Sequence, residues 1–153
     1  MRVRALPVAC LLASLTLPAA AQDIAQLEAA LDAVRSSNRV LLSGSLPLDA
    51  NQAKGFWPEY DRYERELKPI DLRSARLIAE IVASGGAPAA GRVEALVAEH
   101  IQLQQDRLKL LSEHVRRVGK LLPAARLARY VQLDNRLDLQ LRYELAQRIP
   151  LVN

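Results

Sequence analysis

The sequence has a single cysteine, Cys10, which lies close to the N-terminus. All later residues therefore lack the thiol needed for a disulfide, a thiolate nucleophile or a thiolate metal site. Aromatic residues make up only 4% of the chain, and no apolar run reaches the roughly 18 to 20 residues that span a bilayer. Glycine-rich phosphate loops, nucleophile elbows and HExxH pairs are also absent from the sequence. These absences favour a protein without a cofactor, without enzymatic activity and without stable membrane insertion.

The first 21 residues have the pattern of a secretory signal peptide. Two arginines precede an uncharged apolar stretch over residues 5–17, and Pro18 stands before the triplet Ala19-Ala20-Ala21. The small side chains at the first and third positions of this triplet suit a signal peptidase. We therefore expect a signal peptide over residues 1–21, cleavage after Ala21 and a periplasmic location.

Residues 22–153 have the length of one domain, and we expect a single helical domain there. The whole chain has 21 Lys and Arg against 17 Asp and Glu, but two of the arginines belong to the expected signal peptide. The positive charge that remains is small. Together with the expected export, it argues against nucleic acid as a partner.

Apolar residues recur at spacings of three and four along the chain, which predicts an all-α fold of about four helices. The first helix is expected to begin at Asp23 as its N-cap and to end at Ser43-Gly44-Ser45. Its expected inward residues are Ile24, Leu27, Leu31 and Val34, with a weaker continuation through Val40 and Leu41.

The second helix is expected to open with a capping box, in which Asp49 and Gln52 satisfy each other's backbone amides. We expect bends at Pro58 and Pro69, with a break at Pro69 as an alternative. A glycine-rich turn over residues 84–88 follows. The expected inward residues of this helix are Phe56, Tyr60, Tyr63, Leu67, Ile70, Leu77 and Ile81.

A third helix over about residues 89–120 and a fourth that starts at Pro123 and stops before Pro150 complete the expected fold. The expected inward residues are Val97, Ile101, Leu108, Leu111, Val115, Val118 and Leu122, followed by Leu127, Tyr130, Leu133, Leu137, Leu141 and Leu145. Long helices joined by tight turns predict an elongated antiparallel hairpin or bundle. In such a shape, some apolar stripes are expected to stay exposed or to pair in a homodimer.

Two groups of residues are candidates for binding a client or a partner protein. The aromatic group is Phe56, Trp57 and Tyr60, for which packing in the core is the alternative. The basic group is Arg107, Lys109, Arg116, Arg117 and Lys120, for which an ordinary solvated helix end is the alternative.

The two histidines, His100 and His114, each follow a glutamate and are weak candidates for metal binding. They stand 14 positions apart, which corresponds to roughly 21 Å along one helix, so they cannot share an ion within one chain. Ordinary histidines on a helix surface are the favoured interpretation.

In pattern, residues 45–148 resemble the Spy/CpxP-like family of small periplasmic helical proteins, which carry an LTxxQ motif. The segment Leu48-Asp49-Ala50-Asn51-Gln52 stands where that motif opens a helix, with aspartate in place of threonine. The second expected copy, residues 122–126, lacks both the threonine and the glutamine. The resemblance implies a helical hairpin, usually a cradle-shaped dimer, that binds unfolded proteins or an envelope sensor protein under stress.

The sequence thus favours a periplasmic chaperone-like or stress-adaptor protein that binds its clients through apolar helix faces flanked by basic residues. A periplasmic heavy-metal sensor and a structural envelope protein with one dedicated partner are the alternatives.

Overall fold

The computed structural model describes residues 19–146, and four α-helices make up nearly all of this part of the chain. They are α1 (Ala19–Ser45), α2 (Ala50–Ala83), α3 (Ala90–Val118) and α4 (Ala124–Ala146). The predicted all-α fold is confirmed. Most of the predicted signal peptide, residues 1–18, lies outside the described residues. The predicted N-cap Asp23 is wrong, because α1 is already helical from Ala19.

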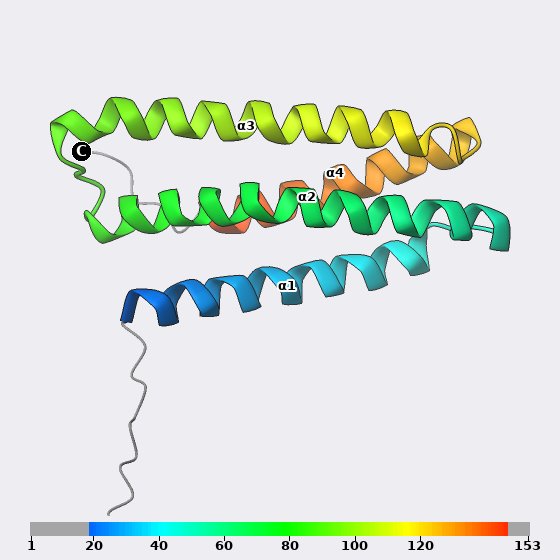
Figure 1. Cartoon of the computed structure of the whole chain (residues 1–153), viewed down its shortest axis with the longest axis horizontal. Helices are drawn as coiled ribbons and strands as arrows, with labels where there is room; N and C mark the ends of the chain where they lie inside the picture. The colour runs from blue at the N-terminus through cyan, green and yellow to red at the C-terminus, as the bar shows by residue number, and fades with distance from the viewer. Residues whose placement is uncertain (1–18, 147–153) are drawn as a thin grey trace, which may run out of the picture.

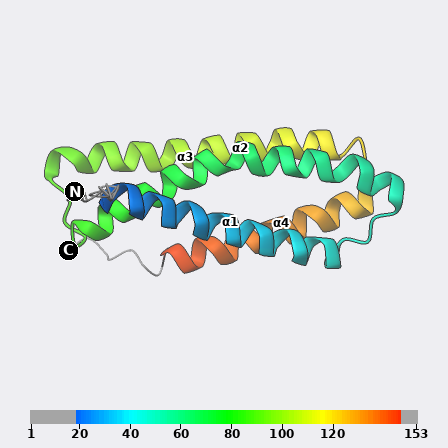
Figure 2. The same cartoon turned by 60° about the horizontal axis from the view of Figure 1, so that its bottom comes forward.

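The helices run alternately in opposite directions and form an elongated four-helix bundle (Figure 1). Figure 2 shows two layers, with the hairpin of α2 and α3 in one and the pair of α1 and α4 in the other. The packing between α2 and α3 is the most extensive in the bundle, and that between α3 and α4 is much sparser. None of the helices among residues 19–146 is long and apolar enough to cross a membrane.

Local sequence signals set the ends of α2. The predicted capping box is present: Asp49 accepts a hydrogen bond from the Gln52 amide at 2.9 Å, and the Gln52 side chain accepts one from the Asp49 amide. The predicted glycine turn follows α2, with φ of 63° at Gly85 and 80° at Gly86, a conformation that glycine adopts without strain.

A break at Pro69, the alternative to the predicted bends, does not occur, because α2 continues through Pro58 and Pro69. Both prolines lie on the exposed side of the helix, where water can satisfy the carbonyl groups that they leave unpaired. Figure 2 shows that α2 changes direction along its length without a break.

The tightest part of the core lies at the end of the bundle where α1 meets α2 and α3 meets α4. All four helices or the loops between them contribute to it through Leu42, Leu46, Phe56, Tyr60, Val118, Leu122 and Tyr130. A smaller apolar cluster of Leu77, Leu96 and Leu103 lies toward the other end, near the turn between α2 and α3. At that end α2 and α3 are only partly covered by the shorter helices α1 and α4 (Figure 2).

Candidate functional site

A layer of charged side chains crosses the interior of the bundle, and every helix contributes to it. Arg35 of α1 places its Nη2 2.8 Å from Oδ2 of Asp71 in α2. Arg107 of α3 binds the other carboxylate oxygen of Asp71, and its Nη1 lies 2.6 Å from Oδ1 of Asp138 in α4. An unpaired buried charge is costly, so these contacts fix which side of α3 faces the interior.

Burial opposes the ionisation of the acids in this layer. It raises the pKa of Asp71 and of Glu64, although neighbouring guanidinium groups favour the charged forms. It also raises the pKa of Asp134 to about 7, and the charges of Asp138 and Glu64 add to this effect. The layer brings four carboxyl groups together with only two guanidinium groups, so a proton on Asp134 reduces an excess of negative charge.

A completely buried histidine lies next to this layer, and the prediction of a helix-surface histidine is wrong for His114. Its ring stacks on Tyr63 with 4.3 Å between centroids, and its Nε2 lies 2.8 Å from the Tyr130 hydroxyl. That hydroxyl lies 3.4 Å from Oδ1 of Asp134. Burial, and then the charge of Arg117, lower the pKa of His114 to about 4, so the ring is neutral at physiological pH. It serves as a core residue.

The predicted aromatic binding group lies in the core. Phe56 and Tyr60 are buried, and their rings pack together with centroids 5.9 Å apart. Trp57 is half-buried, packs edge-on against both, and is covered by the Arg39 guanidinium carbon 4.7 Å from its ring centre. These side chains therefore hold α2 against its neighbours and leave little surface for a client, which favours the alternative of packing in the core.

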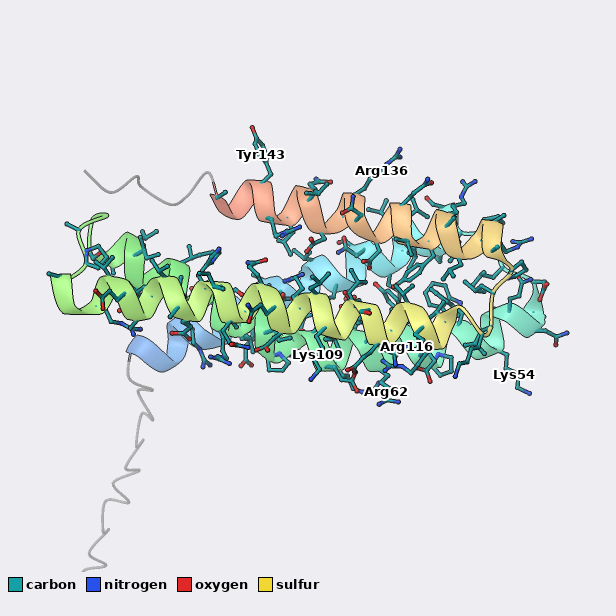
Figure 3. The ribbon with its side chains drawn as sticks, turned by 90° about the horizontal axis from the view of Figure 1, so that it is seen from above. Lys54, Arg62, Lys109, Arg116, Arg136 and Tyr143 are labelled. Atoms are coloured by element: carbon teal, nitrogen blue, oxygen red, sulfur yellow. The ribbon has the colours of Figure 1, made fainter. Side chains whose placement is uncertain are left out.

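The predicted basic group is divided between the interior and the surface. Arg107 belongs to the charged layer, and Arg117 forms ion pairs with two glutamates of α2 at 2.8 and 3.5 Å. Lys109, Arg116 and Lys120 are exposed, and none of them forms an ion pair with another described residue. Figure 3 shows Lys109 and Arg116 on the same edge of the molecule.

A row of apolar side chains lies exposed on α3. Val93, Val97, Ile101 and Leu108 are 41%, 55%, 51% and 67% exposed. The last three were expected to face inward. The α3 residues that face the interior are Leu96, Leu103, Arg107, His114 and Val118. Of these five, only Val118 had been predicted to face inward. We call Val93, Val97, Ile101 and Leu108 the α3 apolar row. Lys109 and Arg116, together with Lys120 in the turn just after the helix, are called the α3 basic row.

The interior positions of the charged layer carry a signal in the sequence. Asp71 stands four residues after buried Leu67, and Arg107 stands four residues after buried Leu103. A charged residue that stands on the apolar side of a helix is expected to be buried, and burial requires a partner of opposite charge. Arg35 and Asp138, by contrast, are recognisable as members of the layer only from the assembled bundle.

Metal binding was considered for both histidines. His100 is exposed on α3, whereas His114 is buried, and the two are not brought together. Within residues 19–146, no three His, Cys, Asp or Glu side chains are grouped so that they could hold a metal ion.

No family model, no curated protein and no solved structure matches this chain.

Proposed function

We propose that this chain is an exported chaperone-like or stress-adaptor protein that binds apolar segments of unfolded or partner proteins on the outer surface of α3. The single observation that carries the proposal is the α3 apolar row, which the α3 basic row follows along the chain. The expected signal peptide supports a periplasmic location. An envelope sensor protein is one example of a partner protein that the surface of α3 could bind.

The arrangement of the exposed apolar residues is what favours binding. Single apolar side chains are common on protein surfaces, but four exposed apolar side chains along one side of a helix form a patch of the kind that marks an interaction surface. The row spans positions 93 to 108, which corresponds to roughly 22 Å of helix. Covering one such side chain stabilises a complex by about 1 kcal/mol.

The charge beside the row indicates the kind of segment that it binds. Lys109, Arg116 and Lys120 are free to attract acidic side chains, and this attraction raises the rate of encounter more than the final affinity. Because Arg107 anchors α3 through two interior ion pairs, the row is presented on a fixed helix. We therefore propose an apolar client segment flanked by acidic residues.

Suppression of the aggregation of an acidic, chemically unfolded client, measured by light scattering, tests the proposal. The variant Ile101→Glu/Leu108→Glu places two charges in the α3 apolar row. The control Ala95→Glu/Gln102→Glu adds the same charges at the same spacing on exposed positions of α3 that belong to neither row.

The unaltered protein and the control are expected to suppress aggregation at a several-fold molar excess, and the row variant is expected to lose most of this effect. Equal suppression by both variants would place binding elsewhere. No suppression by the unaltered protein would contradict the proposal, and one stable stoichiometric complex in its place would favour the dedicated-partner alternative. Sedimentation of both variants also reports whether the row holds a second copy of the chain, as in the expected homodimer.

A further inference from the structure

A cavity of about 500 Å³ lies at the partly covered end of the bundle. Its walls are mainly aliphatic, and Leu77, Ile78, Ile81 and Leu96 provide much of them. All four helices contribute, because Leu31 of α1 and residues of α4 complete the wall. On the inner side, the cavity ends at the charged layer, where Asp71 and Arg107 belong to its lining.

The walls suit a hydrocarbon chain better than a peptide. They are made by helices whose backbone amides and carbonyls already bond within each helix, so an entering peptide would find few partners for its own backbone. A hydrocarbon chain has no such groups to satisfy. With roughly 30 Å³ for each methylene group, about the volume of a water molecule, the cavity accepts on the order of 12 to 16 carbons.

The polar side chains at the cavity indicate the chemistry of the head group that a bound hydrocarbon chain would carry. Arg142 of α4 lines the cavity with a side chain that is 43% exposed. It holds Asp138 at 2.7 Å through Nη2 and reaches Gln104 at 3.4 Å through Nη1. The guanidinium group has further N–H donors, and the exposed His100 lines the cavity one helical turn from Gln104. Arg107 is held by Asp71 and Asp138 in the charged layer, so Arg142, which is partly exposed and has N–H donors to spare, is the cation of the lining that favours an anionic head group.

We infer that this cavity binds a single-chain amphiphile with an anionic head, such as a long-chain carboxylate. The hydrocarbon chain lies among Ile78, Ile81 and Leu96, and the head lies beside Arg142 and His100. The inference does not rest on client binding by α3, since the α3 apolar row is exposed on the surface and shares only Val97 with the cavity.

Calorimetric titration of the purified protein with decanoate, dodecanoate and tetradecanoate, each below its micelle concentration, tests the inference. We expect one site per chain and an affinity that rises about fourfold for each added methylene until the cavity is full. Dodecyltrimethylammonium, which has the same chain and the opposite charge, is expected to bind at least tenfold more weakly.

Two pairs of variants test where the ligand lies. Ile78→Trp fills the cavity from α2 and is expected to abolish binding, whereas Val82→Trp, one turn later and outside the lining, is expected to bind normally. Arg142→Gln is expected to weaken dodecanoate binding three- to tenfold. Its control is Arg136→Gln, because Figure 3 shows Arg136 pointing away from the rest of the bundle.

Several outcomes would overturn the inference. They are equal binding of the two dodecyl compounds, unchanged binding by Ile78→Trp when circular dichroism shows it folded, and binding that appears only after residues 147–153 are removed. The last result would mean that the chain fills its own cavity. Failure of the aggregation assay would leave this inference intact, because none of the four substitutions tested here lies in the α3 apolar row.

Discussion

Replacing Asp134 with asparagine is expected to stabilise the protein at neutral and alkaline pH and to leave its stability in acid unchanged. Burial and the neighbouring Asp138 and Glu64 raise the pKa of Asp134 to about 7 in the folded protein, from an ordinary value of 3.8. The folded state therefore holds a proton on this carboxyl group that the unfolded state has already released. Asparagine has the same shape and can still accept a hydrogen bond from Tyr130.

The magnitude follows from the difference between the two pKa values. At about 1.4 kcal/mol for each pH unit, a pKa of about 7 in place of 3.8 corresponds to about 4 kcal/mol. The stability that the protonated carboxyl group contributes is fully present below about pH 4, and it is lost as the pH rises through about 7. The asparagine side chain cannot ionise, so the variant keeps this contribution at pH 8.

Urea unfolding of both proteins between pH 3.5 and 8.5, at constant ionic strength, measures the effect. The free energy of unfolding of Asp134→Asn minus that of the unaltered protein should be near zero at pH 4 and reach a few kcal/mol by pH 8. The same change at Asp106, which bonds to Gln102 on the surface of α3, serves as a control with little expected effect. A difference that stays constant with pH would refute the reasoning.

Three further changes test the interior and the turn. In the unaltered protein, stability is lost as the pH falls from 6.5 through about 4, because the buried neutral imidazole of His114 must become charged. His114→Phe should remove this loss, and urea unfolding as a function of pH measures it. Arg107→Met should cost about 3 kcal/mol of unfolding free energy, since it deprives the buried Asp71 and the partly buried Asp138 of a partner. Gly85→Ala should lower the unfolding free energy by about 1 to 2 kcal/mol, because its φ of 63° strains a side chain, whereas Gly91→Ala, where the added methyl meets open space, should not lower the thermal midpoint.

Helix positions and ends could be predicted from the sequence because they depend on local signals. The capping box at Asp49 and the turn at Gly85 are settled by a few neighbouring residues, and both are confirmed. The apolar stripe of α2 was also largely predictable, since Phe56, Tyr60 and Leu67 are all buried as expected. The continuity of α2 through its two prolines depends on their exposure, which the local sequence does not reveal.

The orientation of α3 could not be predicted in the same way. Along this helix, one stripe contains Arg107 and His114, and the neighbouring stripe contains Ile101 and Leu108. Hydrophobicity alone selects the second stripe as the interior. The first is buried because Asp71 of α2 and Asp138 and Tyr130 of α4 bind its charged and polar side chains, and these partners come together only in the folded bundle. Because the first stripe is buried, the second stripe stays on the surface, and its exposed apolar side chains are the ones on which the proposed function depends.

The most direct test of the proposed function is photo-crosslinking from α3 to an unfolded client. A photoreactive phenylalanine analogue is placed at Leu108 in the α3 apolar row, or at Ala95, which is exposed on α3 outside both rows. A chaperone-like role of the α3 apolar row predicts strong crosslinking to an unfolded acidic client from position 108, weak crosslinking from position 95, and little from either position to the folded client. Equal yields from the two positions, or no crosslinking from position 108, would contradict it.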